Sequence, residues 1–191
     1  METTKTRSCV FSSFKAKTIA LIVSIAACVA LPHFFHALGA VTDMGTALGE
    51  TFLPMHIAVF AVALLAGPVV GAVCGALSPL ISFLITPLTL HAPMPTQFML
   101  PFMVIELATY GAVCGAFAGV KMPDVVKVLI SQIAGRGVRA VAIVIGFYAF
   151  SSPIGPAVIW SSVVAGLPGI ILQLVLVPLF VYYVKSQANN E

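Results

Sequence analysis

The sequence predicts an all-α integral membrane protein with six transmembrane helices and both termini in the cytoplasm. Of its 191 residues, 60% are hydrophobic and 8% are charged, whereas about a quarter of the residues of a soluble domain carry charge. A transmembrane helix needs about 20 apolar residues, so a chain of this length accommodates roughly six of them. We expect one transmembrane domain over residues 1–191, made of a short basic tail at 1–14 and a six-helix bundle at 15–185.

Apolar runs and the glycines and prolines between them place the helices in order. The first helix is expected over about 15–38, and its length favours a retained helix over a signal peptide. A polar stretch at 39–51 precedes a short second helix at 52–66, which Gly67-Pro68 breaks. The remaining helices are expected over about 69–86 (closed by Pro87), 98–120, 124–150 and 157–183, the last disturbed at 166–169.

The distribution of charge predicts the orientation. The basic residues of the tail, of the fourth-to-fifth turn and of the carboxyl end include Lys5, Arg7, Lys15, Lys17, Lys121, Lys127 and Lys185. The alternate loops carry Asp43, Glu50 and His91 as their ionisable residues. Basic loops remain in the cytoplasm. Nine Lys and Arg against six Asp and Glu leave no basic surface for nucleic acid.

No catalytic motif accompanies these helices. The sequence lacks a nucleophile elbow, a zinc-binding H-E-x-x-H and a Walker A loop. It also lacks a C-x-x-C pair, and three of its four cysteines fall inside apolar runs, which disfavours a disulfide framework or structural zinc. We therefore expect a protein that is not an enzyme, and any ATP-driven transport would need an ATPase from another chain.

Two glycine ladders predict close helix packing. The hexapeptide Gly-Ala-Val-Cys-Gly-Ala occurs at 71–76 and again at 111–116. Each copy belongs to a run with glycine at every fourth position, 67–75 in the third helix and 111–119 in the fourth. Such runs let two helices approach closely. We favour tight packing of these helices over an internal duplication.

Histidine and methionine gather on the expected outer side. These residues are His33, His36, His56, His91, Met44, Met55, Met94, Met99 and Met103. Imidazole and thioether groups are ligands for porphyrin iron, cobalt, nickel or copper. Each residue alone is compatible with a membrane interface, but the gathering of all of them indicates an outward-facing ligand pocket.

Three ionisable residues are expected inside the membrane core. Glu106 lies about 12 Å below the outer start of its helix, and Arg136 and Arg139 lie about 17 and 21 Å above the inner start of theirs. In a core about 30 Å thick these depths nearly coincide. Because buried charges are paired or face a cavity, either Glu106 pairs with one arginine or an arginine binds a substrate carboxylate.

Several motifs together resemble a known family. They are Leu53-Pro54-Met55-His56-Ile57 at the second helix, Gly67-Pro68-x-x-Gly71 after it, and Leu167-Pro168-Gly169-Ile170-Ile171 leading to Pro178. Over roughly 15–185 the chain is similar to the substrate-binding S-components of energy-coupling factor (ECF) transporters. The resemblance implies a receptor in the plasma membrane of a prokaryote that captures a micronutrient outside. It also implies docking on a transmembrane coupling (T) subunit with two cytoplasmic ATPase subunits, and toppling to release the ligand.

The same resemblance implies a docking surface on the first helix. Members of the family dock through small residues there, and in this chain Ala16, Ala20 and Ser24 form such a stripe. Ala26 and Ala30 form a second stripe nearby, while Cys28 continues the first. Packing within the chain is the alternative role for the first stripe.

The expected ligand is haem or a related tetrapyrrole, carried as substrate with no resident cofactor. One tryptophan, Trp160, and few polar groups near the outside disfavour the stacking contacts of thiamine, biotin or riboflavin receptors. His56 is the expected axial ligand to haem iron. The other expected substrate-binding residues are Met55, His33, His36 and His91 as second ligands, Phe52 with Phe34, Phe35 and Phe102 against the macrocycle, and Arg139 or Arg136 at a propionate, with Glu106 at the same depth.

Other ligands and one other class of protein remain as alternatives. Cobalamin is a close alternative because imidazole also binds cobalt. Nickel or cobalt ions come next, since Met55-His56 resembles the start of the nickel and cobalt receptors but is internal here; another vitamin is also possible. An electron-transferring haem protein ranks lower, because the histidines occupy a single layer.

Overall fold

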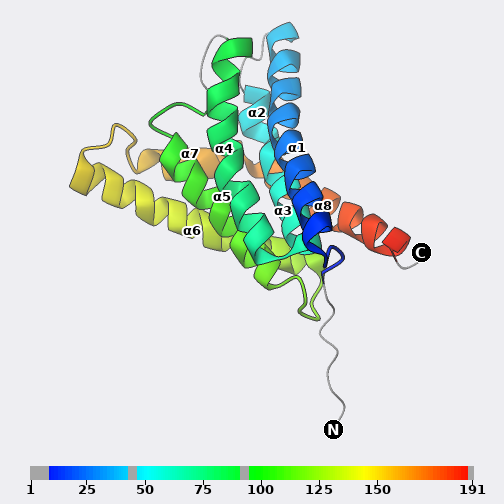
Figure 1. Ribbon diagram of the computed structural model, residues 1–191. Coiled ribbons are helices and arrows are strands. Elements are labelled where there is room, and N and C mark those ends of the chain that lie inside the picture. Colours follow the sequence, from blue (N-terminus) through cyan, green and yellow to red (C-terminus); the bar gives the residue numbers. More distant parts are fainter. Residues whose placement is uncertain (1–8, 43–46, 91–94, 189–191) are drawn as a thin grey trace.

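The computed structural model describes residues 9–42, 47–90 and 95–188, a part of the chain in which helices are the only regular secondary structure (Figure 1). The helices are α1 (Phe14–Val41), α2 (Ala47–Phe52), α3 (Pro54–Ala66), α4 (Pro68–Leu90), α5 (Leu100–Ala116), α6 (Asp124–Phe150), α7 (Ala157–Ala165) and α8 (Leu167–Ala188). Four of these, α1, α4, α6 and α8, are long and apolar enough to cross a membrane, whereas α3 and α5 are apolar but shorter. The all-helical prediction is thereby confirmed for the described residues.

Several predicted helix ends were wrong, for local reasons. Pro87 lies inside α4, which continues to Leu90; a proline removes a single hydrogen bond of a helix, and neighbouring helices can compensate for that loss in a membrane. α5 ends at Ala116, four residues before the predicted end. The chain there tightens into turns in which Ala118 N donates to Gly115 O (3.1 Å) and Val120 N to Phe117 O (3.0 Å).

The helices are interrupted at two places, of which the sequence predicted one, the disturbance at 166–169. The polar stretch at 39–51 contains most of α2, and Leu53 separates α2 from α3 with φ 48° and ψ 50°. A left-handed backbone is uncommon for a leucine, and Pro54 follows at a position where a helix needs no N–H donor. At the other interruption, Gly166 separates α7 from α8.

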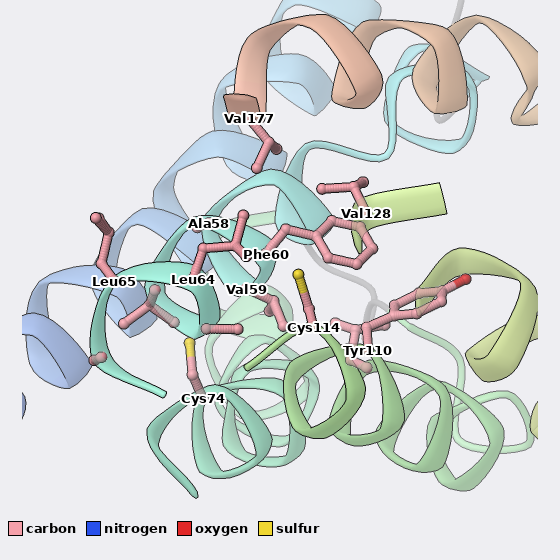
Figure 2. Close-up of a cluster of buried hydrophobic side chains, with 14 of the residues drawn as sticks. Ala58, Val59, Phe60, Leu64, Leu65, Cys74, Tyr110, Cys114, Val128 and Val177 are labelled. Carbon is pink, nitrogen blue, oxygen red and sulfur yellow. The ribbon is translucent and has the colours of Figure 1, made fainter. Parts of the chain in front are cut away.

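The central helix of the bundle is α3. Of its thirteen residues only Ile57 is not buried, because α1, α4, α5 and α8 all pack around it. Figure 2 shows its side chains, Val59, Phe60 and Leu64 among them, meeting residues from α4, α5, α6 and α8. At about 20 Å long, α3 is shorter than a membrane core.

The two glycine ladders form the contact between α4 and α5. A Cβ on Gly111 would collide with the Gly71 backbone, and one on Gly75 would collide with the Leu107 backbone. As the residue number rises on α4 it falls on α5, so the two helices are antiparallel. The predicted close packing is confirmed, and a side chain at these positions would separate the helices.

Salt bridges identify one end of the bundle. Asp124 at the start of α6 accepts from Lys127 Nζ at 2.8 Å and from Lys185 Nζ of α8 at 3.1 Å. Before α1, Phe11 N donates to Leu65 O at 3.0 Å, near the end of α3. We call this the basic end. Figure 1 shows α1 and α4 alongside each other, with α6 and α8 crossing them at a large angle.

Candidate ligand site

Five polar side chains from three helices come together inside the apolar bundle. They are His56 of α3, Glu106 and Tyr110 of α5, and Arg136 and Arg139 of α6. We call them the polar cluster. Desolvating such groups is unfavourable unless they bind one another or a ligand, so the partners of each indicate which of them is free to bind.

Glu106 is the fully satisfied member of the polar cluster. Its side chain is 2% exposed, Oε1 accepts from the Tyr110 hydroxyl at 2.7 Å, and Oε2 accepts from Arg139 Nη1 at 3.1 Å. Arg139 Nη2 also lies 3.6 Å from Met99 Sδ. The predicted pairing of Glu106 with an arginine is therefore present, and the arginine is Arg139.

His56 lies at the first turn of α3 and is buried. Its ring centroid is 5.4 Å from that of Tyr110, and Nδ1 is buried with no hydrogen-bond partner in the described chain. Met55 beside it belongs to the apolar core, with its carbonyl accepting from Cys28 Sγ of α1 at 3.4 Å. Of this expected pair of ligands, only His56 belongs to the polar cluster.

Arg136 differs from Arg139 in its surroundings. Nε of both arginines is buried without a hydrogen-bond partner among the described residues, but Arg139 binds the Glu106 carboxylate and Arg136 binds no described carboxylate. Arg136 lines, with Arg139 and Ser162, a hollow between α6 and α7 of about 200 Å³ including the part open to solvent. The enclosed part of that space has room for about one water molecule, so a ligand group can reach Arg136 only if α6 and α7 move apart.

A pair of buried amides supports the site and was not predicted. Gln132 Nε2 of α6 donates to Gln173 Oε1 of α8 at 2.8 Å, and Gln173 Nε2 donates to Leu53 O at 3.4 Å. The amides therefore link α6 and α8 to the left-handed residue that precedes α3. Two glutamines within helices expected to span the membrane were the available signal, since buried amides need partners.

The other predicted ligands lie elsewhere. Cys28 is level with Met55, so His33 and His36 lie about 8 and 12 Å further along α1, beyond the start of α3. His33 Nδ1 lies 2.7 Å from Val29 O, and the His36 ring packs against Gly49 of α2. His91 is outside the described residues. Within the described part of the chain, no three His, Cys, Asp or Glu are grouped to hold a metal ion.

The phenylalanines expected to cover a macrocycle are divided between two places. Phe35 stacks on Phe52 of α2, with a centroid distance of 5.3 Å, and contacts Phe34 edge-on at 5.7 Å. Phe102 of α5 instead packs close to Gly146 of α6. Phe52 itself lies at the α2–α3 junction, where a Cβ on Gly169 of α8 would contact its carbonyl oxygen.

The two small-residue stripes of α1 differ in exposure, one packing partly against the bundle and the other being open to the surroundings. Ala16, Ala20 and Ser24 are half-buried, and Ala20 packs against the core that contains Cys28. Ala26 and Ala30 are exposed. They line an apolar groove between α1 and α4, of about 750 Å³ including open space, together with Ile22, Ile25, Val29, His33, Ile81 and Ile85.

Comparison with known proteins gives one match. A family model described as "ECF transporter, substrate-specific component" matches residues 12–181, which is most of the chain. Neither the curated proteins nor the solved structures gave a match. The matched range includes every residue of the polar cluster and both stripes of α1.

Proposed function

The chain belongs to the family of ECF transporter substrate-specific components, and we propose that it captures a haem-like tetrapyrrole for ATP-driven uptake. The family implies a substrate-specific, multi-pass membrane receptor that works with a coupling subunit and ATPase subunits. The observation that carries the ligand proposal is the buried imidazole of His56, which is close enough to Arg136 and Arg139 to interact with their charges. An imidazole binds porphyrin iron, and guanidinium groups bind carboxylates such as propionates.

The proposed topology has six membrane crossings. α1, α4, α6 and α8 are long enough to span; α5 is the fifth crossing, and α2 with α3 forms a sixth that is broken at Leu53. Interrupted backbone is tolerated at membrane depth where protein buries it or it lines a cavity. In this proposal the basic end, which carries Lys127 and Lys185, faces the cytoplasm of a prokaryotic cell, as the positive-inside rule favours, and the polar cluster is reached from outside.

Binding of a macrocycle requires the bundle to open beside Arg136. The present hollow between α6 and α7 is too small for a porphyrin. α7 buries none of its residues fully, so moving it away from α6 would uncover Arg136 at little loss of packing. In this proposal the ligand enters between α6 and α7 and approaches His56.

Haem titration of the purified chain in detergent tests this proposal. We expect saturable binding with a shifted Soret band in the wild type, loss of that shift in His56→Ala, and its recovery when free imidazole fills the vacated position. His33→Ala is the matched control, because His33 lies in the α1–α4 groove, and it should bind haem as the wild type does. A Soret titration without saturation in the wild type would contradict the haem assignment.

The same preparation separates the alternative ligands. Cobalamin, riboflavin, thiamine, biotin, Ni²⁺ and Co²⁺ can each be added while thermal unfolding is recorded. A ligand that binds the native state raises the unfolding midpoint with its concentration. A rise with one of these compounds and none with haem would replace the tetrapyrrole by that compound and leave the receptor function intact.

The proposed docking surface for the coupling subunit is α1. Only 6% of the residues in the apolar stretch of α1 are buried within the protein, against 22–39% in the corresponding stretches of the other three long helices. Its small residues would let a partner helix approach closely. The structure makes Ala26 and Ala30 the more accessible stripe, whereas Ala16, Ala20 and Ser24 are shared with intramolecular packing.

Co-purification with the coupling subunit and ATPases tests the docking surface. Ala26→Trp and Ala20→Trp should both reduce recovery of the complex, but Ala20→Trp should also lower the unfolding midpoint because Ala20 packs on the core. Ile171→Trp on the exposed face of α8 is the control and should leave the complex unchanged. Full recovery of the complex with Ala26→Trp would exclude that stripe.

A further inference from the structure

The polar cluster contains one more positive charge than its own residues neutralise. Arg136 and Arg139 face a single carboxylate, Glu106, whose two oxygens are already occupied by Tyr110 and Arg139. The other acidic side chain that the structure describes is Asp124, which binds Lys127 and Lys185 at the basic end. Asp124 precedes Arg136 by three turns of α6, about 18 Å. Within the described side chains, Arg136 has no carboxylate partner.

The surroundings of Arg136 are built from the two helix interruptions. A Cβ on Gly166, at the α7–α8 break, would lie 3.6 Å from Arg136 Nη2 and 2.9 Å from Leu53 Cδ1 at the α2–α3 break. Helix interruptions within a membrane bundle are a feature of ligand sites, because they free backbone groups at membrane depth. Gly166 therefore lies beside the Arg136 guanidinium, and the break at Leu53 lies against Gly166.

Two guanidinium groups make the hollow beside Arg136 positive. It is lined by Arg136 and Arg139 of α6 and by residues of α7 that include Ile159 and Ser162. The helix ends at the two breaks add no net potential, because α2 and α7 end where α3 and α8 begin and the end of a helix carries a partial negative charge.

We propose that Arg136 anchors a carboxylate of the transported ligand, which makes the substrate an anionic micronutrient. The inference rests on the proposed receptor function and narrows its substrate class. Arg139 is held by Glu106 and serves as the structural member of the pair, whereas Arg136 retains a free fork for bidentate contact with a carboxylate. The ligand then supplies the negative charge that the described side chains lack.

Stability of the ligand-free chain tests the charge imbalance without knowledge of the ligand. In detergent, Arg136→Met should raise the midpoint of thermal unfolding by about 2–4 °C, since it removes an unpaired charge. Arg139→Met should lower the midpoint, because it leaves Glu106 without its cation. Lys15→Met at the exposed start of α1 should have no effect. A fall with Arg136→Met as large as that with Arg139→Met would mean that Arg136 has a partner inside the chain, and would overturn the proposal.

Matched ligand pairs test the substrate class itself. The probes are haem with haem dimethyl ester, pantothenate with pantothenol, and lipoate with lipoamide, each pair differing in its carboxylate. We expect one carboxylate to raise the unfolding midpoint of the wild type. Its neutral partner should need at least a tenfold higher concentration for the same rise. In Arg136→Met the two members of that pair should act at equal concentrations. Equal stabilisation by both members would overturn the proposal. Co-purification of the wild type with the coupling subunit tests the receptor function separately. A chain that forms the complex but does not distinguish the paired ligands contradicts only the role of Arg136.

Discussion

Glu106 organises the polar cluster because it binds two partners while nearly fully buried. Tyr110 donates to one oxygen and Arg139 to the other. A buried ion pair contributes little net stability compared with an apolar pair of the same shape, but removing one partner alone is strongly destabilising. The pair therefore holds α5 and α6 in one register beside the proposed ligand site.

Glu106→Gln should destabilise the protein more than removal of both charges does. The single change leaves the Arg139 guanidinium buried without a counter-charge, and we expect a loss of about 3 kcal/mol. The double change Glu106→Gln with Arg139→Gln should recover most of that loss. Unfolding midpoints in detergent measure both, and a double variant less stable than the sum of its singles would contradict the pairing.

At this scale the sequence predicted that Glu106 meets an arginine but could not decide which one. Arg136 and Arg139 are three positions apart and share one side of α6, so depth alone does not separate them. The rotation of α6 against α5, set by Gly135 packing on Tyr110, decides the choice. His33 and His36 lie apart from His56 because α1 continues beyond the start of α3.

At the scale of helices, Gly135 allows the contact that builds the polar cluster. A Cβ on Gly135 would collide with the Tyr110 ring and lie 3.0 Å from Glu106 O, whereas a Cβ on Gly137 would meet nothing within 4 Å. The two glycines lie on the same helix and differ only in the face that they occupy. They form a matched pair for testing the α5–α6 contact.

Gly135→Ala should destabilise the protein by about 1–3 kcal/mol through overpacking. Gly137→Ala should instead be neutral or stabilise it by up to about 1 kcal/mol, through helix propensity. Thermal unfolding of the two variants in the same detergent measures the difference. Equal midpoints would show that α5 and α6 do not approach at Gly135.

The amide pair links α6 to α8 and α8 to the residue before α3. Gln173→Leu leaves the Gln132 amide without its partner and removes a donor from Leu53 O, so we expect a loss of about 1–3 kcal/mol. Gln132→Leu combined with Gln173→Leu should be less harmful than Gln173→Leu alone, because no amide is left unpaired. A double variant as unstable as the sum of both singles would contradict this link.

Helix positions and the disturbance at 166–169 were predictable from the sequence, while the break at Leu53 was not. The bounds of α6 follow from Pro123-Asp124 at its start, a local signal, and were predicted correctly. The break at Leu53 has no such signal, because leucine rarely adopts a left-handed backbone. It depends on contacts from α8, where Gln173 binds Leu53 O and Gly169 admits the 51–52 backbone, and such contacts are visible only once the bundle has formed.

At the scale of the whole molecule, the bundle has one basic end and one end where the helix interruptions lie. Asp124 joins α6 to α8 at the basic end, while Leu53 and Gly166 meet beside Arg136 further along the bundle. A receptor that captures its ligand outside and releases it inside needs such an asymmetry. The basic end should therefore face the cytoplasm, and the loop before α7 should face outside.

Cysteine labelling of intact cells tests this orientation. With the four native cysteines replaced, Lys121→Cys and Gln187→Cys place a thiol at exposed positions of the basic end, and Ala157→Cys places one at the exposed start of α7. A membrane-impermeant maleimide should label Ala157→Cys in intact cells, because the positive-inside rule leaves the loops without lysine outside. Lys121→Cys and Gln187→Cys should react only after permeabilisation. Labelling of Gln187→Cys without permeabilisation would reverse the orientation, and labelling of Ala157→Cys and Gln187→Cys from the same side would exclude an α8 that crosses the membrane.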